Sequence, residues 1–212
     1  MAGTQARGRI DKRAAILAGA FAVFARKGYA AAGVQDIAAE AGVAKPTVYN
    51  HLTDKATLFR SALEATARAK LDERIAAIEP LYEPGDDLPG TLGLVGHRLL
   101  RVHGDATSCA LRRLLYAEVT RFPEALELVS AYGPHRVVRA LADPLGRLTL
   151  AGRLTATEPA LAAEQLMALL VGPMEARSRM GTREVADAEY REVAAAATAT
   201  FLRAYGPAST GG

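Results

Sequence analysis

The sequence has a single cysteine and no long uncharged stretch, and both absences exclude whole classes of protein. With only Cys109 among 212 residues, no internal disulfide framework forms and a reducing compartment is expected. The longest uncharged stretch, Ala14–Ala25, has 12 residues, against the roughly 20 that a membrane-spanning helix needs. Because Arg26 and Lys27 follow directly and the apolar spacing is helical, the stretch indicates a folded helix rather than a secretion signal. We expect a cytoplasmic protein that makes no membrane contact.

Tryptophan is absent, and aromatic residues make up only 6% of the chain. Alanine is abundant and β-branched runs between paired turns are scarce, which favours helices over strands. Hydrophobic residues make up 50% of the chain, enough for a full core in one large domain or in a small and a medium one. The composition therefore predicts an all-α protein.

Signatures of catalysis and of phosphate binding are missing as well. The chain contains neither GxGxxG nor GxxxxGKS/T, and Gly93–Gly96 lacks the rest of either pattern. His97 and His103 are six residues apart, which is not the i, i+4 spacing of a helical metal site. Cys109 is either a small buried residue or a thiol that senses oxidants. We predict no enzymatic activity, no metal site and no cofactor.

The net charge of +3 is unevenly distributed. Residues 1–60 hold nine Lys and Arg and four Asp and Glu, a net charge of +5, whereas residues 61–212 hold seventeen and nineteen, a net charge of −2. A basic segment on a mildly acidic body suits a surface that contacts nucleic acid, because attraction to phosphates supplies much of the affinity. A solvated basic face gives the same count, so the assignment depends on a motif.

The first part of the chain is predicted to form three helices. Apolar residues recur at steps of three and four before Gly28, which is placed to end the first helix: Ile10, Leu17, Ala20, Phe21 and Phe24. The second helix is expected at Val34–Ala41 and is followed by Gly42, which can take a positive φ. The third is expected from Lys45 to Leu52, with Pro46 tolerated in its first turn. Two short helices around a glycine turn predict a helix-turn-helix.

A long fourth helix and a helical second domain are expected to follow. Thr53 and Asp54 supply capping side chains for a helix over Lys55–Ile78, and the proline- and glycine-rich residues 79–90 predict a loop. Further helices are expected at residues 91–103, 106–121, 123–152, 158–179 and 185–205, the third kinked or broken by Pro134 and Pro144. The predicted division is a DNA-binding domain over residues 1–54, a second domain over 55–206 and a flexible tail over 207–212.

Residues 13–59 resemble the DNA-binding domain of TetR-family repressors. The segment RAAILAGAFAVFARKGYAAAGVQDIAAEAGVAKPTVYNHLTDKATLF has GY before the second helix, DIA within it, AGV in the turn, TVY in the third helix and K before LF, all at the family spacing. The family usually has Ser or Thr where this chain has Gly33, and Phe where it has Leu52. Residues 111–134, LRRLLYAEVTRFPEALELVSAYGP, and the segment EPALAAEQLMALLVGP resemble the AefR-like type of C-terminal domain.

The third helix is expected to lie in the major groove with one face on the protein core and the other on the DNA. Val48 and Leu52 at i and i+4 face the core, whereas Pro46 and Asn50 point the other way. Lys45 and Lys55 suit phosphate contacts, and Gln35 can reach a base edge or a phosphate; Arg7, Arg9 and Lys12 are candidates along the groove rim. The predicted DNA-binding residues are Gly33, Gln35, Lys45, Pro46, Thr47, Tyr49, Asn50, His51 and Lys55.

The resemblance implies that the second domain binds a small-molecule effector, largely through apolar side chains. The apolar stripes of the last two helices, residues 158–179 and 185–205, predict a homodimer. Candidate pocket residues, each also consistent with ordinary core packing, are Leu100, His103, Leu114, Tyr116, Phe122, Tyr132, Met167, Leu170 and Met174. A two-fold dimer requires a near-palindromic double-stranded DNA operator. The alternatives are an architectural DNA-binding module without an effector, and activation of transcription in place of repression.

Overall fold

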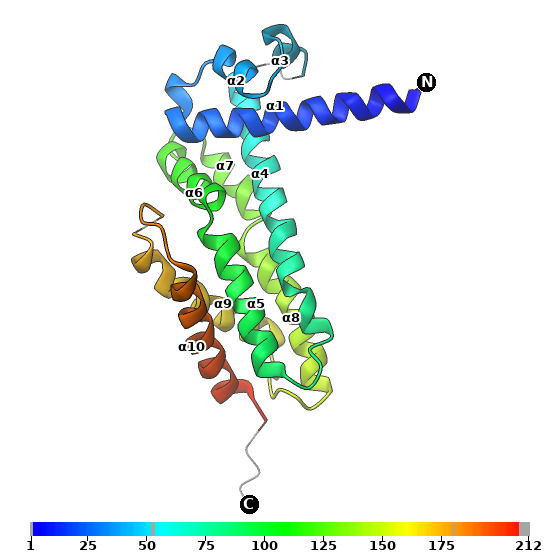
Figure 1. Cartoon of the computed structure of the whole chain (residues 1–212), viewed down its shortest axis with the longest axis vertical. Helices are drawn as coiled ribbons and strands as arrows, with labels where there is room; N and C mark the ends of the chain where they lie inside the picture. Colours follow the sequence, from blue (N-terminus) through cyan, green and yellow to red (C-terminus); the bar gives the residue numbers. More distant parts are fainter. Residues whose placement is uncertain (1, 52–53, 180, 208–212) are drawn as a thin grey trace, which may run out of the picture. The chain divides into compact units, whose positions relative to one another are not determined.

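The computed structural model describes residues 2–51, 54–179 and 181–207, and the side chains of 12–50, 54–179 and 181–207. In these residues the chain forms α-helices, one 3₁₀ turn (Glu79–Tyr82) and no strand, so the prediction of an all-α fold is confirmed (Figure 1). The first half contains α1 (Ala2–Ala31), α2 (Val34–Glu40), α3 (Lys45–His51), α4 (Lys55–Ile78) and α5 (Leu88–Gly104). The second half contains α6 (Ala106–Glu118), α7 (Pro123–Ser130), α8 (Pro134–Leu150), α9 (Pro159–Arg177) and α10 (Asp187–Tyr205).

The two prolines of the long segment 123–152 have different effects. Pro134 occupies the first position of α8, where a missing backbone N–H costs nothing, so the segment is divided there into α7 and α8. Pro144 lies inside α8 and is buried, and the helix continues through it to Leu150. The expected broken pair is therefore present, with its break at the first proline.

The chain divides into two compact units that do not follow the order of the sequence. The first unit comprises Met1–Ala69 and Ala110–Tyr132, and the second comprises Lys70–Cys109 and Gly133–Gly212. The sequence-based boundary at residue 54 assumed that each domain is one continuous stretch of chain. In the structure, the first half of α4, most of α6 and all of α7 belong to the same unit as α1, α2 and α3. The expected tail, except Pro207, lies outside the described residues.

The core of the first unit explains why α1 is so apolar. Lys12–Ala31 is long and apolar enough by composition to cross a membrane, but its buried face packs in the core of this unit. Phe24, Phe59, Tyr29 and Phe122 form an aromatic cluster with ring centroids 4.7–5.9 Å apart. Such aromatic contacts add to the free energy of burial. This segment therefore folds as the central helix of the unit.

In the second unit, α5 lies between η1, α9 and α10, and α8 packs on α9. α9 and α10 also contact each other, and both appear side by side in Figure 1. The buried side of α9 consists of Ala162, Ala163, Leu166, Leu170 and Met174. Its other side exposes Leu161, Ala168 and Gly172 together with the acidic residues Glu164 and Glu175.

Candidate nucleic-acid interface

The end of α1 positions the helices that follow. Gly28 has φ +73°, in the left-handed region that glycine adopts without a Cβ penalty, so the regular helix ends there as the sequence predicts. Gly19, in the middle of α1, is the closest approach of α1 to the end of α2, because a Cβ built on it would lie 3.0 Å from the backbone nitrogen of Ala41. A larger side chain at residue 19 would therefore push α2 away from α1.

Ion pairs attach α2 to α1 at both ends. Lys27 Nζ lies 2.9 Å from the Asp36 carboxylate, and Arg26 contacts Glu40 at 2.9 Å. The Lys27 ammonium and the backbone amide of Gly33, 3.3 Å from Asp36 Oδ2, hold the pKa of the Asp36 carboxyl below its usual value. Gly33 is the N-cap of α2 in extended conformation, as expected for a residue that replaces Ser or Thr at this position. The acidic residues of α2 thus face α1, and Gln35 remains exposed.

The turn between α2 and α3 is a complete Schellman motif. Gly42 has φ +63°, its N–H donates to the carbonyl of Ala39, and the N–H of Val43 donates to that of Ala38. These hydrogen bonds satisfy the carbonyls of Ala38 and Ala39 in the last turn of α2 and set the direction in which the chain enters α3. The predicted role of Gly42 is confirmed.

Replacing Gly42 by alanine should destabilise the protein without any steric clash. No atom lies within 4 Å of a Cβ built on this residue, so the expected cost of about 1–2 kcal/mol comes from the left-handed backbone alone. Chemical denaturation of Gly42→Ala measures it. Gly93→Ala in α5 is the matched control: it has equally open space but a helical backbone, and should stabilise by about 0.5–1 kcal/mol. Equal effects of the two substitutions would contradict the role of the turn.

The short helix α3 has one buried and one exposed face. Val48 is only 2% exposed and packs in the core of the first unit with Ile37 and Ala38. Tyr49 is 52% exposed, Asn50, Lys45 and Pro46 are exposed and Thr47 is half-buried. The predicted orientation of this helix is therefore present from Lys45 to Asn50. The side chain of His51, all of Leu52 and Thr53, and the side chains of Arg7 and Arg9 lie outside the described residues.

The start of α4 is fixed by two neighbouring residues. The carboxylate of Asp54 accepts hydrogen bonds from the amide and the hydroxyl of Thr57, at 2.7 and 2.9 Å, which confirms the predicted capping residue. Lys55 does not extend freely into solvent: its Nζ donates to the Ala30 carbonyl at 3.0 Å and lies 4.8 Å from the centroid of the Tyr29 ring. Lys55 therefore joins α4 to the end of α1.

Glu118, at the end of α6, makes a contact that the sequence alone does not predict. Its carboxylate accepts a hydrogen bond of 3.2 Å from the backbone N–H of Tyr29, directly after the break at Gly28. Arg121 lies over the Tyr29 ring at 5.0 Å, and Phe122 contacts the ring at 4.7 Å. The segment 118–122 thus holds the end of α1, although no local pattern marks it because the contact spans 89 residues of sequence.

The nine candidate pocket residues are divided between the two units. Leu114, Tyr116, Phe122 and Tyr132 belong to the first unit, and the other five to the second. Tyr116 is 62% exposed, so its ring is not part of the buried core. Tyr132 is half-buried and donates to Glu64 Oε1 at 3.0 Å, while His103 and Met167 are half-buried. The remaining residues are buried: Leu100, Leu114, Phe122, Leu170 and Met174.

Comparison with known protein families agrees with both predicted resemblances. A model described as "AefR-like transcriptional repressor, C-terminal domain" matches residues 90–207, and one described as "Bacterial regulatory proteins, tetR family" matches residues 16–62. Among characterised proteins, the transcriptional activator FasR of Mycolicibacterium smegmatis is 41% identical over 56 residues, which is 26% of each chain. The aligned part thus spans about a quarter of that activator.

Solved structures extend the similarity over the whole fold. A TetR-family transcriptional regulator from Mesorhizobium loti MAFF303099 is 32% identical, with a TM-score of 0.84 over 92% of this chain and 96% of the other. The flavonoid-responsive regulator FrrA is 25% identical, with a TM-score of 0.72 over 93% and 98% of the two chains. These relatives are transcriptional regulators, which confirms the prediction that the chain is not an enzyme. The chain belongs to the TetR family of transcriptional regulators.

Proposed function

We propose that the chain is a cytoplasmic homodimeric repressor that binds a near-palindromic operator through residues 33–55 and releases it when a small apolar molecule binds. The observation that carries the DNA-binding part is the orientation of α3. Val48 anchors the helix in the core, the opposite face exposes Asn50 with Tyr49 at its side, and Lys45 is exposed in the first turn. A phenol, an amide and an ammonium exposed on one short helix can contact base edges and phosphates in a major groove.

The proposed dimer uses the outer faces of α9 and α10. These faces expose Leu161, Ala168 and Gly172 on α9 and Ala196 and Ala199 on α10. Small side chains allow close approach of helices, and the two contacting helices would meet their symmetry mates in a four-helix arrangement. The two recognition helices of such a dimer would read two inverted half-sites.

The two lysines of the interface should differ in their effects. Lys45→Ala and Lys55→Ala should each lower the salt slope of DNA binding by about one unit, because each removes one phosphate contact. Lys55→Ala should also lower the melting temperature, because Lys55 binds the Ala30 carbonyl and the Tyr29 ring. Gln35→Ala should instead alter sequence preference. Fluorescence anisotropy at several salt concentrations measures how steeply DNA affinity falls with salt. If this slope is unchanged in both lysine variants, the two lysines do not contact phosphates.

The proposed effector site involves the buried apolar residues of the second unit, among them Leu170 and Met174. An effector there should weaken operator binding by roughly 5–150-fold, corresponding to a coupling of about 1–3 kcal/mol. The reason to expect this coupling is that α4 begins at Lys55 in the first unit and ends at Ile78 in the second, so one helix belongs to both units. The flavonoid response named for FrrA supports the choice of aromatic, weakly polar compounds for a first screen.

A thermal-shift screen followed by operator titration tests this coupling. A ligand that binds only the native state raises the melting temperature, and operator affinity is then measured with and without it. Met174→Trp should abolish the ligand's effect if the ligand lies beside this buried residue. Calorimetric binding with unchanged operator affinity at saturation would favour the alternative, a DNA-binding module without an effector.

A further inference from the structure

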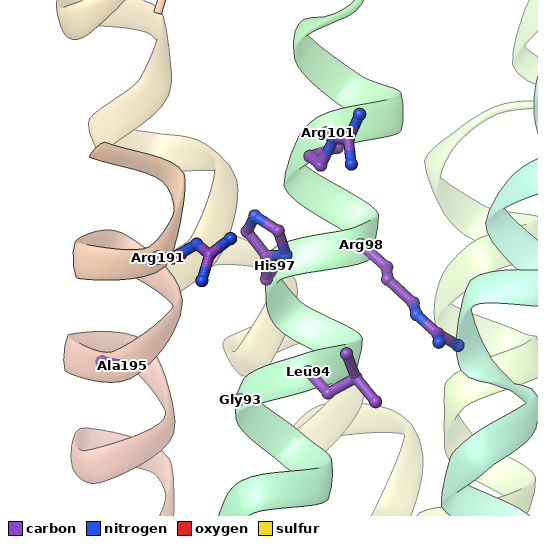
Figure 2. A pocket seen from close by; sticks show the side chains of 7 residues that line it. All are labelled: Gly93, Leu94, His97, Arg98, Arg101, Arg191 and Ala195. Atoms are coloured by element: carbon purple, nitrogen blue, oxygen red, sulfur yellow. The ribbon is translucent and has the colours of Figure 1, made fainter. Parts of the chain in front are cut away.

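A surface groove between α5 and α10 carries a concentration of positive charge that the proposed DNA and effector sites do not use. The groove has a volume of about 530 Å³ and lies entirely in the second unit (Figure 2). It is lined by Gly93, Leu94, His97, Arg98, Arg101, Arg191 and Ala195. Its volume is within the range of roughly 300–1,000 Å³ typical of small-molecule sites.

Three guanidinium groups surround this groove, but one carboxylate neutralises only part of their charge. Asp187 lies 2.8 Å from both Arg191 and His97, and 4.0 Å from Arg101. The hydrogen bonds from Arg191 and His97 hold the pKa of the Asp187 carboxyl below its usual value, so it is ionised at neutral pH. Three arginines and one aspartate leave two positive charges in excess.

Of the three arginines that line the groove, Arg98 is the one that forms no ion pair with a described residue. Figure 2 shows Arg191 reaching from α10 toward His97, whereas Arg98 extends from the other side of α5. All three arginines line the groove, but the Arg98 guanidinium points away from Arg191. Gly93 and Ala195 are small, which keeps the groove open between the two helices.

We propose that this groove binds a small, multiply charged anion bearing phosphate or carboxylate groups, at a site separate from the proposed effector site. Guanidinium groups bind both chemistries through paired N–H donors in a fixed planar geometry. Arg101 on α5 and Arg191 on α10 would contact charged groups of one ligand, and Arg98 would add a third contact by turning its side chain toward α10. The half-exposed Leu94 would cover its less polar part.

Sodium tripolyphosphate and citrate distinguish the phosphate and the carboxylate forms of the ligand. Calorimetry at low ionic strength should detect binding of at least one of them, and the melting temperature should rise by roughly 5–10 °C at a hundredfold excess over the Kd. The variant Arg98→Gln with Arg191→Gln should bind at least about tenfold more weakly, since the loss of a single charge-assisted pair already costs about this much. The control variant carries Arg136→Gln and Arg139→Gln, which remove the same two positive charges from exposed residues of α8. Its anion affinity should change less than twofold.

Leu94→Glu provides a second test that leaves every arginine and the Asp187 ion pairs in place. It should also weaken anion binding, because it places a carboxylate in the groove. Equal losses in the groove variant and in the α8 control would attribute binding to net charge and overturn the site. Absence of binding by both anions would also overturn it. Weaker binding of random-sequence DNA by the groove variant, without binding of either anion, would assign the groove to DNA instead.

Discussion

Replacing Ala168 by arginine should separate the proposed dimer into monomers and weaken operator binding by about 10²–10⁴-fold, because simultaneous binding of two half-sites is lost. Ala168 lies on the exposed face of α9 that also carries Leu161 and Gly172, with the acidic side chains of Glu164 and Glu175 beside them. An arginine there would place a long charged side chain where the two copies are expected to approach closely, and burying its charge is strongly unfavourable.

Sedimentation velocity and operator titration on the same samples measure both effects. The matched control is Ala76→Arg, an exposed alanine near the end of α4 in the same unit. This control should remain dimeric with nearly unchanged operator affinity. If Ala168→Arg were still a dimer at micromolar concentration, the interface would lie elsewhere on the chain.

A negative charge at Tyr49 should abolish operator binding while leaving the fold intact. Tyr49 is 52% exposed on α3, and the Tyr49→Asp carboxylate would face the phosphates, so a loss of at least about a hundredfold is expected from like-charge repulsion across the interface. The melting temperature should change little because the side chain contributes little to the core.

Val48→Ala, one residue earlier, should have the opposite pattern. Val48 is 2% exposed, and its truncation should cost roughly 2 kcal/mol of stability. At temperatures where the variant is folded, DNA affinity should remain near that of the native protein. Operator titration and thermal denaturation of both variants separate the two faces of α3. A stability loss at residue 49 and a binding loss at residue 48 would show that the helix is turned the other way.

The features predicted correctly depend on neighbouring residues in the sequence. Gly28 and Gly42 mark left-handed backbone, Asp54 caps the helix that follows it, and Pro134 breaks the segment 123–152. Val48 could be assigned to the core from its spacing in a helix of known register. Each of these assignments needs only a few adjacent positions.

The features that sequence reasoning missed are contacts between distant segments. Glu118 binds the Tyr29 amide across 89 residues, and nothing near Glu118 marks it. Gly19 carried a usable signal, since a glycine inside an apolar helical stripe often marks a close backbone approach. The exposure of Tyr116, a candidate pocket residue on α6, also could not be read from neighbouring residues. The assignment of α6 and α7 to the first unit likewise follows from packing rather than from order in the chain.

Selection of DNA fragments by the purified full-length protein tests the central proposal most directly. Sequencing of the bound fragments should yield a near-palindrome whose inverted half-sites are separated by about one turn of DNA, 34–36 Å in the simplest case. The selection should be repeated with Asn50→Ala, whose exposed amide is available for a base contact; it should recover fragments with a relaxed preference at one position of each half-site. Fragments with a single unpaired half-site, or no enriched sequence at all, would contradict a two-fold dimer that reads DNA through α3.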